Sequence, residues 1–259
     1  MSDPSVRAFY DSLAPDYHRI FADWNASMTR QAAVFGSLLQ DGVGPGSHRV
    51  LDCSCGIGTQ AIGLALAGHR VVGSDLSPVS AARATAEAAA RGVPVPTAAA
   101  DMRRLPFAPG VFDVVVCADN SVAHLLTAPD VEAALAGMRR VLRDGGLLVL
   151  TVRDYDEIRR TRPRTTPVQV SESSDGGRMI TVQLWHWHED GERYDQEYFQ
   201  LVPGDGDDCA VRVRRTTSWA LTRSQLTEFV TAAGFVDVRW HDPGDSGIYQ
   251  PVLTARASR

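Results

Sequence analysis

The segment that most constrains this chain is residues 50–59, an apolar run that enters a glycine pair and continues into a helix-like stretch. Gly56 and Gly58 let the backbone approach a bound ligand without Cβ clashes. Backbone N–H groups at the start of the following helix suit an anionic group. Asp75 ends the next apolar run, where a carboxylate can accept both hydroxyls of a ribose. The segment therefore predicts a strand–loop–helix turn that binds a nucleoside cofactor.

Two nucleoside cofactors compete for this turn. The spacing Gly56-x-Gly58-x-x-Ala61 also fits the dinucleotide fingerprint, and a purely structural glycine turn is the third interpretation. Asp52 precedes Gly56, where its carboxylate would repel a pyrophosphate but hold the amino group of a methionine moiety. Asp101 follows the next strand and is suited to an adenine amino group. We therefore predict S-adenosylmethionine as the cofactor, with S-adenosylhomocysteine as the product.

The central part of the chain alternates between short apolar runs and helix-like stretches. Strands are predicted near residues 49–53, 70–75, 95–100, 112–118 and 146–152, and helices near 59–67, 78–91 and 130–142. Such alternation is typical of a parallel sheet with helices on both faces. A helix near 223–233 and strands near 235–241 and 249–255 end the chain. We predict an α/β fold with a doubly wound, mostly parallel, Rossmann-like sheet of seven strands.

Two regions depart from this alternation. Residues 5–41 show helical spacing of apolar side chains, which predicts an N-terminal helical lid over residues 1–45. Residues 165–220 contain β-like runs separated by polar turns near 173–177, 189–191 and 203–207. This pattern predicts an antiparallel β insertion that shapes a substrate pocket. Residues 46–164 and 221–259 then form the cofactor-binding core.

Composition excludes several classes of function. The chain has 259 residues and a formal net charge of −5, with no basic stripe, so nucleic-acid binding lacks an electrostatic footprint. No apolar run approaches the roughly 20 residues that span a bilayer, and the first residues do not resemble a secretory signal. We expect a cytoplasmic protein that acts on a small-molecule acceptor. The oligomeric state stays open, with a homodimer as one possibility.

The metal-ligating residue types do not predict a metal site. The four cysteines, Cys53, Cys55, Cys117 and Cys209, include a C-x-C pair in the glycine loop but no second pair of suitable spacing. His186 and His188 share one face of a predicted strand, yet tryptophans flank them. Reduced thiols and a half-buried sheet are the simpler interpretations.

Four segments of the chain match a known family. The stretches VLDCSCGIGT, GSDLS, AADMR and RVLRDGGLLVL resemble the class I S-adenosylmethionine-dependent methyltransferases over nearly the whole chain. A narrower likeness is to the glycine and sarcosine N-methyltransferase group. It depends on FYDSLA at 9–14, Tyr17, IFADW at 20–24, Arg30, DNSVAHL at 119–125 and VRDYD at 152–156. The resemblance implies N-methylation of an amino acid, or of an amine that bears a carboxylate.

The resemblance also implies a set of cofactor contacts. The N-terminal helices would hold the methionine end, with Arg30 on its carboxylate, and Asp75 would hold the ribose. Residues after the fourth strand would line the methionine side and the substrate entrance. The full implied set is Tyr17, Trp24, Arg30, Asp52, Ser54, Gly56, Asp75, Leu76, Asp101, Met102, Ala118, Asp119 and Ser121.

The implied catalytic residues are Tyr17, Asn120, His124 and Arg153. Arg153 would grip the substrate carboxylate, and Asn120 would help to align the acceptor. Both follow strands whose carboxyl ends meet at the rim where open α/β sheets bind ligands. The residues leave other roles open: Arg153 can pair with a following aspartate, and His124 can simply bond to backbone.

Two departures from the narrower group bear on the substrate. Asp119 stands where that group has a glycine, and it can accept the cofactor amino group or cap a helix. Trp219 replaces a tyrosine of the group's substrate pocket, and Trp185 and Trp187 add bulk. A larger or flatter acceptor is therefore expected. The alternatives are O- or C-methylation of a larger metabolite, or cofactor binding without methylation.

Overall fold

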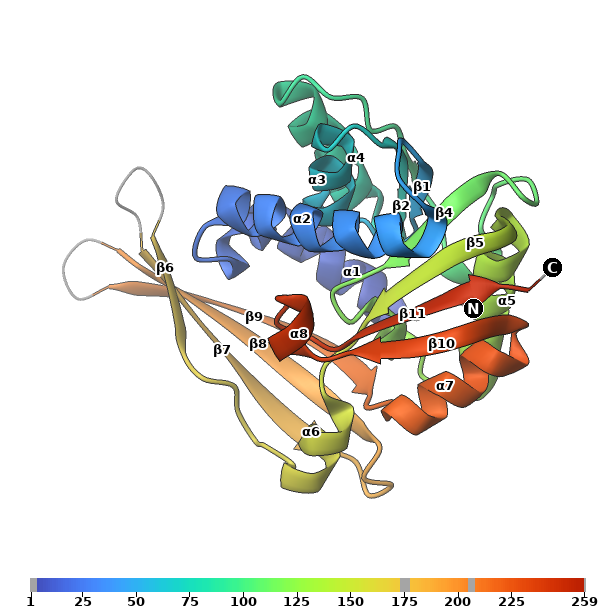
Figure 1. The fold of residues 1–259 in the computed structure, drawn as a ribbon. Coiled ribbons are helices and arrows are strands. Elements are labelled where there is room, and N and C mark those ends of the chain that lie inside the picture. The colour runs from blue at the N-terminus through green and yellow to red at the C-terminus, as the bar shows by residue number, and fades with distance from the viewer. Residues whose placement is uncertain (1–3, 173–177, 205–207, 259) are drawn as a thin grey trace.

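The computed structural model describes residues 4–172, 178–204 and 208–258, and a seven-stranded sheet forms its centre (Figure 1). The strand order is β10-β11-β5-β4-β1-β2-β3, and β11 runs antiparallel to both of its neighbours while the remaining pairs are parallel. This confirms the predicted doubly wound, mostly parallel sheet. The strands are β1 (Arg49–Asp52), β2 (Arg70–Asp75), β3 (Thr97–Ala99), β4 (Phe112–Cys117), β5 (Leu142–Thr151), β10 (Phe235–His241) and β11 (Val252–Ala257).

Helices pack on both faces of this sheet because successive strand residues point to opposite sides. On one face, Val50 and Val114 pack with α2 (Trp24–Val43), α3 (Thr59–Leu66) and α4 (Pro78–Ala90). On the other face, Leu51 and Val115 pack with α5 (Ala128–Val141) and α7 (Arg223–Ala232). The strands are apolar on both sides for this reason. None of the described helices is long and apolar enough to cross a membrane.

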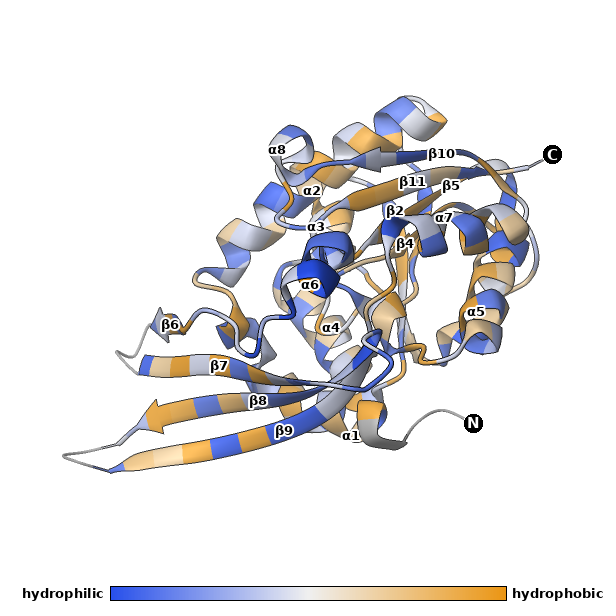
Figure 2. Cartoon of the chain, turned by 90° about the horizontal axis from the view of Figure 1, so that it is seen from below, coloured by the Kyte–Doolittle hydropathy of each residue, from blue (hydrophilic) through white to orange (hydrophobic). Residues whose placement is uncertain are grey.

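A second, four-stranded antiparallel sheet projects from the core, in the order β6-β7-β8-β9 (Figure 1). Its strands are β6 (Gln169–Glu172), β7 (Arg178–Trp187), β8 (Arg193–Pro203) and β9 (Cys209–Trp219). Hydrophobic and hydrophilic residues alternate along β7 and β8 (Figure 2). The structure therefore contains the predicted meander, although residues 173–177 and 205–207 of its predicted turns lie outside the described residues.

The N-terminal segment is less continuous than the helical spacing predicted. α1 (Pro4–Leu13) is followed by the 3-10 helix η1 (Ala14–Ile20), and the chain then breaks before α2. Pro15 lies in the first turn of η1, and extended Asp23 begins α2 by accepting a hydrogen bond from the Ala26 N–H at 2.9 Å. After this break, α2 packs with α3 on one face of the central sheet.

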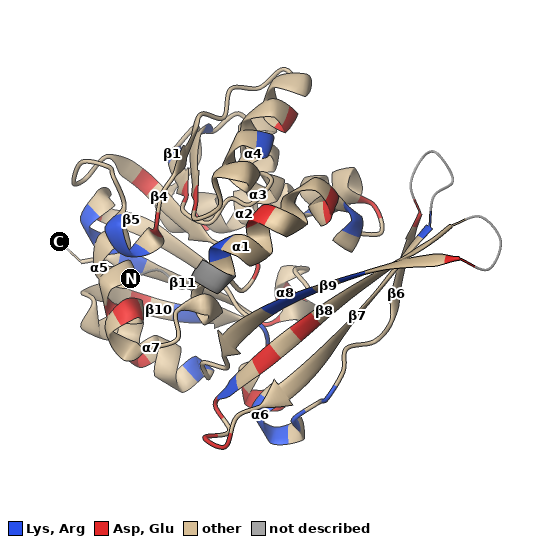
Figure 3. Ribbon diagram, turned by 180° about the vertical axis from the view of Figure 1, so that it is seen from behind, with Lys and Arg blue, Asp and Glu red and all other residues tan. Residues whose placement is uncertain are grey.

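The N-terminal segment lies between the core and the second sheet. Ser77 donates to Asp11 at 2.5 Å from the core side. From the second sheet, Arg214 donates to the Ser12 backbone carbonyl at 2.7 Å, and Arg212 pairs with Asp16. The basic stretch of β9 lies beside an acidic stretch of β8 (Figure 3). The arrangement suits a lid, which stays a prediction, as does the division of the chain into domains.

Short helices that the sequence analysis omitted complete the rim of the sheet. They are η2 (Met102–Arg104), η3 (Ser121–His124), α6 (Tyr155–Thr161) and α8 (Pro243–Ser246). The first three each follow a strand of the central sheet or the loop after it. They are too short for a periodic apolar pattern, so the sequence carried no signal for them.

Candidate active site

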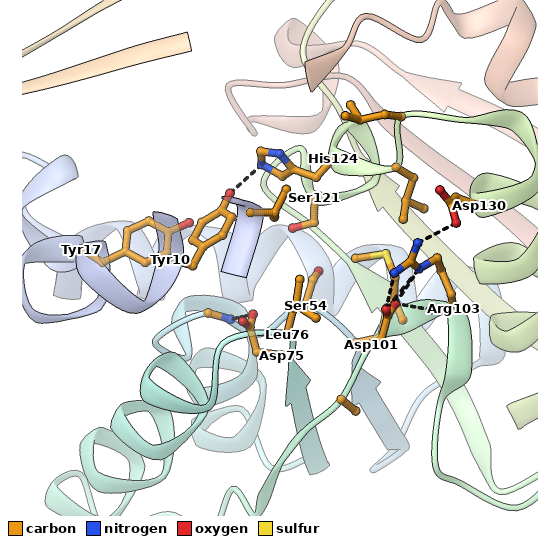
Figure 4. A pocket seen from close by; sticks show the side chains of 17 residues that line it. Tyr10, Tyr17, Ser54, Asp75, Leu76, Asp101, Arg103, Ser121, His124 and Asp130 are labelled. Atoms are coloured by element: carbon orange, nitrogen blue, oxygen red, sulfur yellow. Dashed lines mark hydrogen bonds and ion pairs between the residues drawn. The ribbon is translucent and has the colours of Figure 1, made fainter. Parts of the chain in front are cut away.

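Two neighbouring cavities open at the carboxyl ends of the central parallel strands, where such sheets bind ligands. The first, named here the loop-side cavity, surrounds the glycine loop (Figure 4). Eight of the predicted cofactor residues line it, from the N-terminal segment, the ends of β1, β2 and β3, and η3. They are Tyr17, Ser54, Gly56, Asp75, Leu76, Asp101, Met102 and Ser121.

The glycine loop has the backbone geometry that the sequence predicts. Gly56 and Gly58 have positive φ angles of 50° and 98°, which side-chain-bearing residues adopt at a cost. A Cβ at Gly56 would lie 3.2 Å from Cε1 of Tyr17, and a Cβ at Gly58 would lie 2.7 Å from Cδ1 of Ile62. The first glycine therefore keeps the cavity floor open beneath Tyr17, and the second permits close packing of α3.

Asp75 is held at the end of β2 as a hydrogen-bond acceptor. Its two carboxylate oxygens accept from the backbone N–H groups of Gly56 and Ser77, each at 2.8 Å. Burial raises its pKa to about 6, against the lowering effect of those two hydrogen bonds. The group is therefore mostly ionised at neutral pH and suited to accept ribose hydroxyls, and its contact with a ribose stays a prediction.

Asp52 lies beneath the glycine loop and lines neither cavity. One of its oxygens accepts from the Ser54 N–H at 3.3 Å, while Oδ2 has no hydrogen-bond partner among the described residues. Burial raises the pKa of Asp52 to about 8. An ammonium group nearby would favour its ionised form, so the predicted contact with a methionine amino group stays a prediction.

At the far end of the loop-side cavity, Asp101 forms an ion pair with Arg103. Its Oδ2 lies 2.6 Å from Nη2 of Arg103, which also lies 2.6 Å from Asp130 through Nη1. Although burial raises it, the pKa of Asp101 is held below its ordinary value by the hydrogen bonds from Arg103. An adenine amino group would therefore share this carboxylate with a guanidinium.

Two further predicted contacts lie away from both cavities. The Trp24 indole N–H donates to Thr59 at 2.8 Å, and its ring lies 4.8 Å from the Arg91 guanidinium carbon. Ala118 is buried, and its carbonyl accepts the Ser121 hydroxyl at 2.8 Å. Trp24 packs in the helical core because α2 turns its apolar face to α3, so its role toward a cofactor stays untested.

The second cavity, named here the sheet-side cavity, is the larger, with about 470 Å³ against about 130 Å³ for the first. The N-terminal segment, the turn after β4, the end of β5 and the second sheet enclose it. Among its lining residues are Arg30, Asp119, Asn120, Arg153, Gln183, Gln196, Tyr198 and Tyr249. The structure thus places Arg30 and Asp119, both predicted cofactor contacts, in the same cavity as Arg153.

Arg153 presents its guanidinium to the sheet-side cavity. Its Nη1 donates to Tyr194 at 3.0 Å, and its guanidinium carbon lies 4.9 Å from the centre of the Trp185 ring. The aspartates that the sequence offers as ion-pair partners of Arg153 do not contact it, because Asp154 and Asp156 both contact Arg223. Among the described ion pairs, none joins Arg153 to a carboxylate. The guanidinium is therefore positioned by neutral groups only.

The turn after β4 is strained. Asp119 and Asn120 have φ angles of 52° and 67°, a region that favours glycine. The Asp119 N–H donates to Thr151 Oγ1 at 2.8 Å, and Asn120 Oδ1 accepts from the Arg153 N–H at 3.1 Å. Asn120 thus supports the backbone of Arg153. The glycine of the related group at position 119 would adopt this conformation without strain.

The Asp119 carboxylate caps no helix. It accepts from the Tyr249 hydroxyl at 2.8 Å and from Gln60 Nε2 at 2.9 Å. Burial raises its pKa, and those two hydrogen bonds oppose the rise. Of the two roles considered for Asp119, the helix cap is therefore wrong, and a contact with a bound ligand remains.

Tyr10, Tyr17 and His124 line both cavities and therefore mark their junction (Figure 4). His124 Nδ1 lies 3.2 Å from the Thr217 carbonyl, which only accepts, so Nδ1 carries the proton. Nε2 is then the acceptor for the Tyr10 hydroxyl at 2.8 Å. Burial raises the pKa of Tyr10 and of Tyr17, so both phenols stay protonated at neutral pH.

Several residues of the site were not predicted from the sequence. Tyr10 falls on the apolar period of its predicted helix, so its position gives no separate signal for a role in the site. Tyr194 accepts a hydrogen bond from Arg153, whereas Tyr198 and Tyr249 line the sheet-side cavity, and none of the three follows a local motif. Trp219, expected in the pocket, lies beside Arg193 outside the cavity lining. Strand alternation was the available signal for Tyr194 and Tyr198, because it places both on one face of β8.

The described residues contain no group of three or more His, Cys, Asp or Glu that could hold a metal ion. The four cysteines are free. His186 and His188 lie 3.4 Å and 3.2 Å from the carboxylates of Glu197 and Asp195 respectively. These contacts account for both histidines on the outer face of the second sheet.

Comparison with known proteins identifies a methyltransferase domain within this chain. Residues 50–146 match a family model described as a methyltransferase domain. A glycine/sarcosine N-methyltransferase of Parasynechococcus marenigrum is 38% identical over 137 residues, which cover 52% of this chain and 48% of that protein. The chain spans about half the length of the curated relatives it matches.

Two solved structures share the fold along most of this chain. Streptomyces venezuelae DesVI has a TM-score of 0.74 and 21% identity, and the match covers 98% of each chain. CalS10 of Micromonospora echinaspora, an amino pentose methyltransferase with S-adenosylmethionine bound, has a TM-score of 0.70 and 22% identity, covering 90% of this chain and 92% of that one. At these identities the likeness concerns the fold.

The chain carries a methyltransferase domain at residues 50–146 and shares the fold of S-adenosylmethionine-dependent methyltransferases, so S-adenosylmethionine is the cofactor that this similarity indicates. The residues of the loop-side cavity fit that cofactor: the glycine floor keeps Cβ atoms away from it, and Asp75 offers an ionised acceptor at the ribose position. These similarities agree with the predicted family and cofactor.

Proposed function

We propose that this protein transfers a methyl group to the nitrogen of a small-molecule amine that also bears a carboxylate. The observation that carries the proposal is Arg153, a guanidinium at the cavity wall whose described partners are all uncharged. A buried cation without an anionic partner is costly, and a substrate carboxylate would supply that partner. A guanidinium also binds a carboxylate bidentately, which orients the acceptor.

The cofactor supplies an electrophilic methyl group, and the protein holds and aligns the reactants. Asp75, Gly56 and Ser54 would hold the cofactor in the loop-side cavity. Arg153 would fix the acceptor in the sheet-side cavity, and Asn120 would hold the Arg153 backbone in position. In-line displacement requires the nucleophile and the methyl carbon to be about 3 Å apart and shielded from water. We expect the two reactants to meet at the junction of the two cavities, which Tyr10, Tyr17 and His124 line.

Tyr10 and His124 at the junction can remove the proton that the amine loses. The Tyr10 oxygen accepts an N–H of the acceptor while its own proton moves to Nε2 of His124. The resulting imidazolium keeps its Nδ1 hydrogen bond to the Thr217 carbonyl, which orients the ring and stabilises the charge. His124 thus acts as the general base through Tyr10, whereas Tyr17 packs over Gly56 and shields the site.

A product assay tests the proposal. Glycine, sarcosine and 2-aminohexanoate are incubated with S-adenosylmethionine, beside amines of similar size without a carboxylate, and products are identified by mass spectrometry. We expect N-methylated products only from the carboxylate-bearing amines. Transfer to carboxylate-free amines at equal rates would refute the role of Arg153. Methylthioadenosine without a methylated product would show that the protein uses the cofactor for other chemistry.

A second candidate is O- or C-methylation of a larger metabolite. The volume of the sheet-side cavity, about 470 Å³, favours it because glycine would leave much of the space unfilled. The same assay separates this candidate, since methylation of oxygen or carbon gives products of the same mass but different fragments.

A further inference from the structure

The outer face of the second sheet, which points away from the sheet-side cavity, carries a continuous apolar patch. Strand register places side chains in rows across this face, on the opposite side from the cavity residues Gln196 and Tyr198. Two neighbouring rows, named here the outer patch, are entirely apolar. The first row is Val170, Ile180, Leu201 and Val211, and the second is Val182, Phe199 and Val213.

The outer patch is open to solvent and does not contribute to the core. Val170, Val211 and Val213 are 52%, 56% and 37% exposed, and the other four side chains are partly exposed. None of the seven packs into either hydrophobic cluster of the described core. An antiparallel sheet with one solvated face usually has polar residues on that face. A contiguous apolar surface of this kind therefore marks a place where another molecule binds.

Charged side chains border the outer patch in pairs of opposite sign. On the side nearer the core, the next row contains Glu197 and Arg215, and the Arg215 Nε lies 2.8 Å from a Glu197 carboxylate oxygen. At the other border, strand register pairs Glu172 with Arg178. These two border pairs carry no net charge. A second copy of the same surface would meet balanced charges, whereas an anionic membrane would require an excess of basic residues.

The dimensions of the outer face suffice for a dimer. The strands β7, β8 and β9 contain 10, 11 and 11 residues. At about 3.4 Å per residue and about 4.8 Å between strands, they form a face of about 34 by 14 Å, or about 480 Å². Two such faces with β6 bury about 1,000 Å², which is the area that a specific interface requires. Sheets pack face to face in this way at a separation of about 10 Å.

We propose that the outer patch binds the outer patch of a second copy of this chain, which gives a homodimer of two sheets packed face to face. A twofold contact needs one surface that complements itself, and apolar rows with balanced borders have this property. The proposal does not depend on which acceptor is methylated. Because the opposite face of the same strands lines the sheet-side cavity, the dimer contact lies directly behind the wall of that cavity.

Sedimentation velocity of the full chain at micromolar concentrations tests the proposal. We expect a species of two chains of 28.0 kDa each. The double variant Val211→Lys and Val213→Lys places unpaired ammonium groups in the contact, so its dimer dissociation constant should rise by about a hundredfold or more. The matched control is Val236→Lys, because Val236 is 47% exposed on the edge strand β10, outside the outer patch. The control should stay dimeric.

A milder variant and a test of folding accompany this measurement. Val213→Thr keeps the shape of the side chain but buries a hydroxyl in the contact, so dimer affinity should fall about tenfold. Affinity for S-adenosylhomocysteine should be unchanged in every variant, because the loop-side cavity is lined by no residue of the second sheet. If the lysine variant loses this affinity, the threonine variant decides the result.

Two kinds of result would overturn the proposal. One is a wild-type chain that stays monomeric throughout, including one that instead binds vesicles of phosphatidylglycerol. The other is a dimer that both patch variants leave intact, or that Val236→Lys dissociates to the same extent, since the contact would then lie elsewhere.

Discussion

Replacing Arg153 with lysine tests the substrate class most directly. Lysine keeps the charge but loses the planar fork, so a bidentate carboxylate contact becomes a single contact. One charge-assisted hydrogen bond is worth about 1.5–3 kcal/mol. The Tyr194 contact at 3.0 Å and the Trp185 stacking at 4.9 Å, which orient the fork, are lost as well. We expect kcat/KM for carboxylate-bearing amines to fall about a hundredfold, or about 2.7 kcal/mol.

The assay compares wild-type and Arg153→Lys protein in initial-rate kinetics, with S-adenosylhomocysteine affinity and Tm measured alongside. The control is Arg223→Lys, because Arg223 also stacks on a tryptophan, with its guanidinium carbon 5.4 Å from the Trp240 ring centre, but lies outside both cavities. Cofactor affinity should be unchanged in both variants. A fall in Tm larger than that of Arg223→Lys, a loss of cofactor affinity, or an equal rate loss for acceptors without a carboxylate would refute the reasoning.

Four further predictions concern the cofactor, the junction of the cavities and the N-terminal segment. Asp75 has a pKa of about 6 in the folded protein, raised from 3.8, so S-adenosylhomocysteine affinity should fall as pH drops through about 6. The Asp75→Asn variant should bind S-adenosylhomocysteine about tenfold more weakly at neutral pH, and calorimetry should show no such pH dependence for it. The raised pKa also means that this group's contribution to apo stability is present below pH 3.8 and lost as pH rises through about 6, so Asp75→Asn should have the flatter Tm–pH curve. Tyr10→Phe should lower kcat about a hundredfold with little change in KM, and an unchanged kcat would exclude the proton path. Hydrogen exchange in residues 5–30 should slow when S-adenosylhomocysteine binds, and equal exchange with and without ligand would argue against a lid.

The sequence alone was sufficient for the features that local chemistry specifies. Few folds accommodate a glycine pair that follows one apolar run and an aspartate that ends the next apolar run. In the structure, Gly56 and Gly58 have the expected positive φ angles, and Asp75 accepts a hydrogen bond from the Gly56 N–H. Strand alternation likewise predicted both sheets, because side-chain direction follows the backbone period of two. The family resemblance added Arg153 and Asn120, whose neighbourhood follows from parallel strands ending at one rim.

Tertiary structure alone decided which of those residues share a cavity. Tyr10 and His124 are 114 positions apart, and only the fold of the N-terminal segment over η3 joins them. Two aspartates, Asp154 and Asp156, lie within three residues of Arg153, yet both contact Arg223 of α7. Packing of α7 therefore decides that Arg153 has no ion pair with them. Which side chains of the second sheet reach the sheet-side cavity depends on the register of β7, β8 and β9, which local sequence does not specify. Contacts between segments far apart in the sequence form cooperatively, because each contact becomes favourable only when the others are in place. Local sequence therefore does not predict them.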